Sequence, residues 1–261
     1  METPAMKNPL TFAVLAAAFS AGLAGAAEKA APAPEKVSFV TTDGVTIYGT
    51  YYPGAGPEAA AVVCLPMMGA TRDTYAGLAA RLQKLGYAVL AIDMRGHGES
   101  VDKAGKAIAY KDFKADDFRD MRLDVEAAFV FLADAKKLEP RSRAVVGASI
   151  GATAAVLAAA EDAEIGELVL LSPGLAYRGV SVVDAFKKLK ARPVLVVVGT
   201  MDEYSMRSAK TLDDLGGESV DMETRASKAH GTGLLAQYKV TDAVVDWLKK
   251  IAPPTEASAE K

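Results

Sequence analysis

Three polar side chains in the second half of the chain have the types that nucleophilic catalysis requires. Ser149 lies in the run Gly147-Ala-Ser-Ile-Gly151, Asp202 comes later, and His230 is the only histidine that follows the serine. A serine hydroxyl is a weak nucleophile near neutral pH, so it needs a base to take its proton and a third group to hold that base. We therefore expect Ser149 to be the nucleophile, His230 the base and Asp202 the acid.

Each of these residues also has a simpler interpretation. A lone histidine in a loop is often a surface residue, and an aspartate after a strand is often only the cap of the next helix. Glu203, which directly follows Asp202, is a weaker alternative for the acid because its side chain should point elsewhere. The joint placement of three such residues after three different strands favours the catalytic interpretation.

The segments around the serine predict a sharp turn between a strand and a helix. The apolar run Ala144–Gly147 precedes Ser149, and the alanine-rich run Ala152–Ala160 follows it. Such a turn leaves no room for side chains two residues before and two residues after the serine, which explains the glycines at both positions. We expect the serine hydroxyl to be exposed at the tip of the turn, at the start of the helix.

The rest of the chain alternates between strand and helix patterns. The turn Asp43-Gly44 between two β-rich runs predicts an antiparallel hairpin at the start. Four of the later runs, from Ala60–Leu65 to Leu168–Ser172, are apolar almost throughout, as strands covered by helices on both faces require. The predicted strands are Val37–Val40, Val45–Tyr52, Ala60–Leu65, Ala88–Asp93, Ala144–Gly147, Leu168–Ser172, Val194–Gly199 and Ser219–Thr224.

Two apolar stripes at helical spacing predict helices that cover the sheet. The first consists of Phe118, Met121, Val125, Phe129 and Leu132, and the second of Leu234, Tyr238, Val245 and Leu248. The sequence thus predicts an α/β fold with a mostly parallel sheet of about eight strands, an N-terminal antiparallel hairpin and helices on both faces. The connection from Ser172 to Val194 has room for one short helix near Val182–Lys190, so we expect no large lid domain.

Composition excludes several classes of protein. The 261 residues are 51% hydrophobic and 24% charged with a net charge of −3, which is typical of a globular protein and argues against nucleic acid as a partner. The single cysteine, Cys64, has no partner for an internal disulfide and is expected to be inert and buried. With only two histidines and no Cys/His cluster, we expect no metal site and no cofactor.

The two ends of the chain read as segments outside the fold. Residues 1–27 carry Lys7, an apolar centre and small residues up to Ala27, which is the order of a secretory signal peptide with cleavage after Ala26 or Ala27. Residues 28–36 read as a linker, residues 37–251 as the folded domain, and residues 252–261 as a disordered tail. We expect an exported, periplasmic or secreted protein with no stable membrane insertion after processing; an uncleaved membrane anchor is the alternative.

The combined motifs resemble the α/β-hydrolase superfamily over roughly residues 37–251. They are the serine motif 147–151, Gly199-Thr-Met-Asp202, Ala229-His-Gly231, and the run Asp93-Met-Arg-Gly-His-Gly-Glu-Ser100. Within the superfamily the chain is similar to esterases with little or no lid and to the dienelactone-hydrolase-like branch. Dienelactone hydrolases themselves use a cysteine nucleophile at the position of Ser149, which argues against dienelactone hydrolysis as the activity of this chain. The resemblance gives His97 a structural role, because it precedes the serine.

Acyl transfer places negative charge on a carbonyl oxygen, so two backbone N–H groups must already point at it. The resemblance implies that one belongs to Ile150 and the other to the loop after the strand Ala60–Leu65. Related enzymes often carry His-Gly there, whereas this chain has Pro66-Met67-Met68. We place the second donor at Met68, with Met67 as the other candidate. Both methionines could also be plain core residues or line an apolar substrate pocket, a role that we assign to Met67.

These residues predict a serine hydrolase that cleaves a carboxylic ester or related acyl bond of a small molecule through an acyl-enzyme. A peptidase or thioesterase would use the same residues on another leaving group. A binding module that kept the fold without catalysis is the alternative from a different class, and the altered loop at Pro66 is the feature that favours it. Without a lid the site should be open. Tyr48, Tyr51, Arg72, Tyr75 and Tyr177 could reach substrate, and nothing in the sequence separates them from packing residues.

Overall fold

The structure is a computed structural model that describes residues 31–254. This part of the chain begins with an antiparallel hairpin. Strands β1 (Glu35–Val40) and β2 (Val45–Tyr52) pair antiparallel, as predicted. Gly44 in the turn has φ +86°, a conformation that suits glycine. β1 begins at Glu35 rather than at Val37, and the predicted signal peptide lies outside the described residues.

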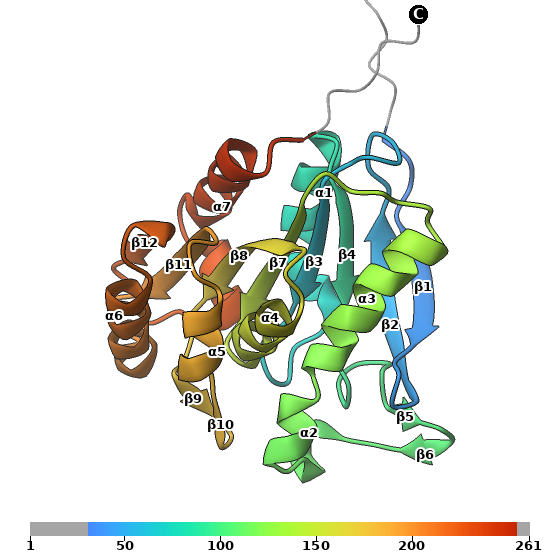
Figure 1. Cartoon of the computed structure of the whole chain (residues 1–261), viewed down its shortest axis with the longest axis horizontal. Helices are drawn as coiled ribbons and strands as arrows, with labels where there is room; N and C mark the ends of the chain where they lie inside the picture. The colour runs from blue at the N-terminus through green and yellow to red at the C-terminus, as the bar shows by residue number, and fades with distance from the viewer. Residues whose placement is uncertain (1–30, 255–261) are drawn as a thin grey trace, which may run out of the picture. The chain divides into compact units, whose positions relative to one another are not determined.

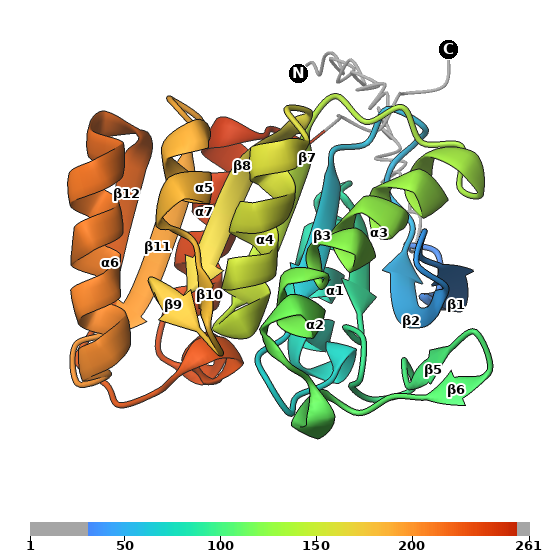
Figure 2. The same cartoon turned by 60° about the horizontal axis from the view of Figure 1, so that its bottom comes forward.

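The following strands extend β2 into a mostly parallel sheet (Figures 1 and 2). The order across the sheet is β12-β11-β8-β7-β3-β4-β2-β5-β6, and β1 pairs with β2. All eight predicted strands are present, and the two-residue strands β5 and β6 add to them at one edge. The bounds are β3 (Ala61–Leu65), β4 (Ala88–Ile92), β5 (Asp102–Lys103), β6 (Lys106–Ala107), β7 (Arg143–Ala148), β8 (Ile165–Leu171), β11 (Val194–Gly199) and β12 (Val220–Arg225).

Helices cover both faces of this sheet, as predicted. Figure 2 shows α3, α4 and α6 in front of the sheet and α1 and α7 behind it. Helix α5 packs on the same face as α4, and η1 leads into α1. The bounds are η1 (Arg72–Tyr75), α1 (Ala76–Lys84), η2 (Tyr110–Asp112), α2 (Ala115–Arg119), α3 (Arg122–Asp134), α4 (Ile150–Glu161), α5 (Val183–Lys188), α6 (Glu203–Gly216), η3 (Gly217–Ser219), η4 (Gly231–Ala236) and α7 (Val240–Ile251).

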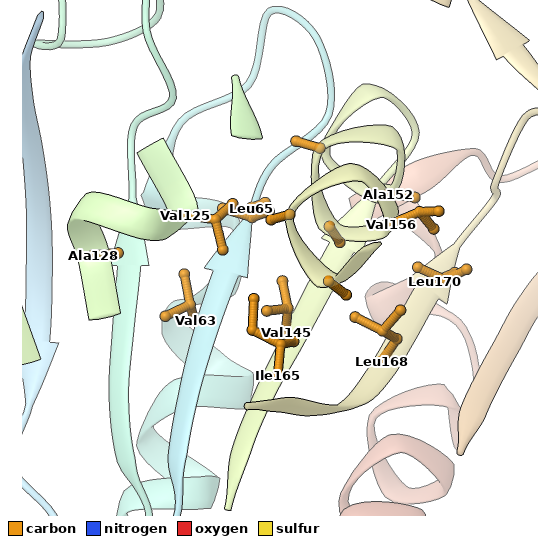
Figure 3. Packing of buried hydrophobic residues seen from close by; sticks show 14 of the residues in the cluster. Val63, Leu65, Val125, Ala128, Val145, Ala152, Val156, Ile165, Leu168 and Leu170 are labelled. Carbon is orange, nitrogen blue, oxygen red and sulfur yellow. The ribbon is translucent and has the colours of Figure 1, made fainter. Parts of the chain in front are cut away.

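The core has two parts because strand residues alternate between the two faces of the sheet. Val63 and Leu65 of β3 pack with α3 and α4, and Figure 3 shows Val125 of α3 beside them. Val62 and Cys64 of the same strand belong to the cluster on the other face, with α1 and α7. Both faces are therefore apolar, which is why the strands read as continuous hydrophobic runs.

The structure corrects two helix predictions. The stripe from Phe118 to Leu132 is divided between α2 and α3, although its residues remain buried. The stripe that was expected to start at Leu234 is divided between the 3-10 helix η4, which contains Leu234, and α7, which begins at Val240 after Lys239 adopts a left-handed conformation with φ +57°. This change of direction leaves Tyr238 80% exposed, so that residue does not belong to the apolar face.

The connection from β8 to β11 contains α5, as predicted, and a short hairpin that was not predicted. Its strands are β9 (Ala176–Tyr177) and β10 (Val180–Ser181), and they pair only with each other. Figure 2 shows the hairpin beside the first turns of α4. Among residues 31–254, no helix has the length and apolar character needed to cross a membrane.

Candidate active site

Ser149 occupies a strained turn between β7 and α4. Its backbone has φ +54° and ψ −113°, and its N–H donates to the carbonyl of Leu171 at 2.9 Å. A Cβ atom on Gly147 would lie 2.4 Å from the carbonyl oxygen of Gly151, and one on Gly151 would lie 2.4 Å from that of Leu65. Backbone atoms cause both collisions, so the two glycines are needed for the tight turn that presents Ser149.

The side chains of Ser149, His230 and Asp202 form a continuous chain of hydrogen bonds. His230 Nε2 lies 2.7 Å from Ser149 Oγ, and His230 Nδ1 lies 2.6 Å from Asp202 Oδ2. The three residues follow the ends of β7, β12 and β11, which lie at the carboxyl edge of the sheet. This arrangement can pass a proton from the serine to the imidazole while the carboxylate stabilises the resulting positive charge.

The loop that carries His230 lies close to the end of β11. A Cβ atom on Gly199 would be 2.5 Å from the carbonyl oxygen of Ser227. The amide of Met201 also donates to that carbonyl at 3.1 Å, and Ala229 N–H donates to the Ser227 hydroxyl at 2.9 Å. These contacts hold the histidine loop against the turn that carries Asp202.

The surroundings of Asp202 favour its ionised form. Burial raises the pKa of this carboxyl, but hydrogen bonds from His230 and Ser205 outweigh burial and hold the pKa below its usual value. Glu203, the alternative acid, lies on the first turn of α6 with its side chain 84% exposed and paired with Arg207 at 3.6 Å. Glu203 thus points away from the histidine, and Asp202 faces it.

The two residues expected to supply oxyanion donors follow the neighbouring strands β7 and β3. Ile150 is the first residue of α4, where helix N–H groups lack partners within the helix. Met68 lies in the turn after β3, which is fixed by hydrogen bonds from Ala70 N–H to Met67 O at 3.1 Å and from Tyr75 to Leu65 O at 2.9 Å. Within residues 31–254, the amides of Ile150 and Met68 donate to no protein acceptor.

The two methionine side chains of this loop have different neighbours. Gly231 has φ +55°, and a Cβ atom on it would lie 2.8 Å from Met67 Sδ, so Met67 packs directly against the residue after His230. Met68 Sδ lies 3.3 Å from Nη2 of Arg178, at the tip of the β9–β10 hairpin. Both side chains are partly buried against the core clusters.

The structure corrects the expectation of an exposed serine. Ser149 is only 7% exposed, whereas the side chain of His230 is 38% exposed. Tyr177 of the β9–β10 hairpin lies beside them, with its ring edge-on to the His230 ring at a centroid distance of 6.4 Å. The sequence offered Tyr177 only as one of five residues that could reach substrate, because the short hairpin that carries it has neither a long apolar run nor helical spacing.

Other polar residues considered from the sequence have structural contacts. His97 is 2% exposed, stacks on the ring of Tyr110 at 4.2 Å and places Nδ1 3.0 Å from Arg95 O. Burial lowers the pKa of this imidazole, which favours its neutral form. Arg72 pairs with Asp93 at 2.5 Å. These contacts hold loops in place and do not reach the serine.

Cys64 lies inside β3 with no exposed surface, and burial raises the pKa of its thiol. Its thiol is therefore protonated and inaccessible, as a structural cysteine is. Within residues 31–254, no three side chains of the kinds that bind metal ions gather in one place.

The fold and this arrangement of side chains define an α/β hydrolase. The sequence model of the family described as "Serine aminopeptidase, S33" matches residues 56–227, and the chain belongs to this family within the α/β-hydrolase superfamily. Two curated sequences from Mycobacterium tuberculosis strains, both described as uncharacterized proteins, are 32% identical to this chain over 158 residues. That match covers 59% of this chain and 50% of each relative, so the chain spans about half their length.

Solved structures share the fold at low sequence identity. The esterase Pf2001 of Pyrococcus furiosus superposes with a TM-score of 0.69 at 20% identity, over 84% of this chain and 91% of that one. A dienelactone hydrolase of Anabaena variabilis gives a TM-score of 0.61 at 19% identity, over 84% of this chain and 96% of that one. These likenesses establish the fold.

Proposed function

We propose that the protein is a serine hydrolase that cleaves a carboxylic ester or a related acyl bond through an acyl-enzyme. The observation that carries this proposal is the hydrogen-bonded chain from Ser149 through His230 to Asp202. A purely binding protein would have no need for a serine, a base and an ionised acid in this order.

The geometry supports a two-stage reaction. Ser149 Oγ bonds to the acyl carbon, its proton passes to His230 Nε2, and the carbonyl electron pair moves onto oxygen. The amides of Ile150 and Met68 stabilise that oxyanion. When the intermediate collapses, His230 gives the proton to the leaving group. Water then attacks the acyl-enzyme by the same route and regenerates Ser149. Asp202 remains ionised and holds the imidazole throughout.

A peptidase is the second candidate, because the matching family is described as a serine aminopeptidase. Ester and peptide hydrolysis share the attacking serine and differ in the leaving group, which is an alcohol in one reaction and an amine in the other. A panel of p-nitrophenyl esters, thioesters and aminoacyl p-nitroanilides separates these possibilities by their kcat/KM values.

Covalent labelling tests the proposal directly. We expect a fluorophosphonate probe to label the wild-type protein and to leave Ser149→Ala unlabelled, and p-nitrophenyl ester hydrolysis to fall to the background rate in that variant. Mass spectrometry of the labelled protein should place the probe on Ser149. A wild-type protein that stays unlabelled under conditions that label ordinary esterases would instead favour the binding module.

A further inference from the structure

A tyrosine phenol lies beside the Ser149–His230 pair and has no role in the mechanism described so far. The hydroxyl of Tyr177 donates to the carbonyl of Ser172 at 3.2 Å and lies 3.2 Å from Oγ of Ser205. The ring stands nearly perpendicular to that of His230, at an interplanar angle of 87°. The phenol is thus part of a group of hydroxyls at the carboxyl edge of the sheet.

Several contacts fix the position of this tyrosine. The hydroxyl of Tyr204 donates to Ala176 O at 2.6 Å and accepts from Ala176 N–H at 3.0 Å, which anchors the hairpin one residue before Tyr177. The two tyrosine rings pack edge to face at 5.4 Å. A Cβ atom on Gly174 would lie 2.5 Å from the Tyr177 ring, so this glycine leaves the space that the ring needs.

The phenol keeps its proton at neutral pH. Burial raises the pKa of Tyr177, and hydrogen bonding with the hydroxyls of Ser205 and Ser149 only partly opposes this rise. An unperturbed tyrosine already titrates near pH 10, so the O–H group remains available as a donor. The backbone places the phenol near the serine, because Ser149 N–H donates to Leu171 O at 2.9 Å and the phenol donates to the carbonyl of the next residue, Ser172.

We propose that Tyr177 is a fourth catalytic residue, whose phenol donates a hydrogen bond to the oxygen atoms of the tetrahedral adduct on Ser149. This inference rests on the proposed hydrolase function. Tyr177 keeps its proton throughout, since the proton of Ser149 passes to His230 and then to the leaving group. The phenol therefore acts only through a hydrogen bond that strengthens as negative charge develops.

The resting contacts of the phenol make this role physically reasonable. Both are 3.2 Å long and join uncharged groups, so each is a weak hydrogen bond. A phenol O–H can rotate about its C–O bond without moving the ring, and a bond to an anionic oxygen is roughly twice as strong as one between neutral groups. The phenol therefore gives up only a weak hydrogen bond when its O–H turns away from Ser172, and it forms a stronger one with the anionic oxygen of the adduct.

The test compares three Tyr→Phe variants in steady-state hydrolysis of p-nitrophenyl butyrate by the full chain. For Tyr177→Phe we expect kcat to fall about 10²-fold, at the lower end of the loss seen for one oxyanion donor, with KM changing less than about three-fold. Urea midpoints should stay close to that of the wild type, because the ring and its packing are kept.

Two controls separate chemistry from packing. Tyr204→Phe removes the hydroxyl that anchors the same hairpin, and Tyr238→Phe removes the hydroxyl of a tyrosine that is 80% exposed before α7. We expect kcat to be unchanged in Tyr238→Phe and to fall far less in Tyr204→Phe than in Tyr177→Phe. Wild-type kcat in Tyr177→Phe, or an equal fall in Tyr204→Phe, would overturn the inference while Ser149-dependent hydrolysis still stood. A wild type without Ser149-dependent hydrolysis would overturn the proposed function and this inference together.

Discussion

Asp202 and Glu203 are neighbours in the sequence, yet their carboxylates have different surroundings. Asp202 is the residue before α6 and has a side chain 13% exposed, with Oδ2 2.6 Å from His230 Nδ1. Glu203 enters the helix, where its side chain turns outward to solvent and to Arg207. At the scale of single residues, one peptide unit thus separates a carboxylate that can orient the imidazole from a surface charge.

This difference predicts how two isosteric variants behave. We expect Asp202→Asn to lower kcat of ester hydrolysis by about 10³–10⁴-fold, because an amide neither fixes the imidazole tautomer nor stabilises the imidazolium. Glu203→Gln, the matched control, should keep kcat within about two-fold, since its ion pair is exposed. Steady-state kinetics on both variants provides the measurement, and the reverse result would make Glu203 the acid.

Two glycines show how the close approach of a helix and a strand limits which residues a position can hold. Gly151 lies where the first turn of α4 touches the end of β3, and an added Cβ would be 2.4 Å from Leu65 O and 2.8 Å from Pro66 O. Gly166 lies in β8 with no atom within 4 Å of an added Cβ. At the scale of elements, replacing glycine by alanine therefore has opposite consequences for stability at these two positions.

We expect Gly151→Ala to lower the free energy of unfolding by about 1–3 kcal/mol, because the strand and the helix must move apart. The same movement shifts the loop that carries Met68, so esterase activity should fall as well. Gly166→Ala should be neutral or stabilise the protein by up to about 1 kcal/mol, since it restricts only the unfolded chain. Urea unfolding of the two variants measures both effects, and equal stabilities would contradict the close packing at Gly151.

The hairpin turn of β1 and β2 is tied to the rest of the sheet by charge. Asp43 lies 3.0 Å from both Nη atoms of Arg95 and 2.7 Å from Nζ of Lys103. Burial raises the pKa of Asp43, but hydrogen bonds from Arg95, Lys103 and Thr41 outweigh it and hold the pKa well below the usual range. The ionised form of this carboxyl therefore stabilises the folded state.

Asp43→Asn should be less stable than the wild type by about 1–3 kcal/mol at pH 7, where the charge-assisted hydrogen bonds are present. The contribution of Asp43 is complete above the pKa of an unfolded aspartate, about 3.9, and is lost as the pH falls below it towards the folded value. The difference in free energy of unfolding between the wild type and Asp43→Asn should thus become smaller below about pH 4. Urea unfolding from pH 7 to pH 3 checks this, and a constant gap would show that the charge of Asp43 is not responsible.

At the scale of the whole molecule, the candidate site exists only while the sheet is intact. Ser149 and His230 are 81 positions apart in the chain, and Asp202 and His230 are 28 apart. Each follows a different strand, so no local segment can bring the three side chains together.

Two other side chains can report whether the sheet is still folded. Trp247, the only tryptophan, is 8% exposed on α7, and Cys64, the only cysteine, is fully buried in β3.

We expect three probes to report a single transition in urea. Fluorophosphonate labelling of Ser149, the fluorescence of Trp247 and the reactivity of Cys64 towards a thiol reagent should change at the same midpoint, as two-state unfolding requires. The thiol should be unreactive before that point, because it is buried and protonated. Labelling lost at a clearly lower urea concentration would show that the site opens before the sheet unfolds.

The order of strands and helices was predictable from the sequence because it depends on short-range patterns. Apolar and β-rich runs identified the eight main strands, and the spacing of Gly147, Ser149 and Gly151 identified the turn that carries the serine. Asp202 and His230 were singled out because each follows a predicted strand and comes after the serine in the chain. The strand that reveals each position lies within a few residues of it.

Contacts between distant segments were decided by the tertiary structure alone. The burial of Ser149, the outward turn of Tyr238 and the placement of Tyr177 beside His230 depend on how loops from different strands pack together. The β9–β10 hairpin has too few residues to show a periodic pattern, and its position comes from side chains such as Tyr204 that lie 28 positions away. Local patterns determine which elements form, whereas the surroundings of a reactive atom are set by residues that only folding brings near it.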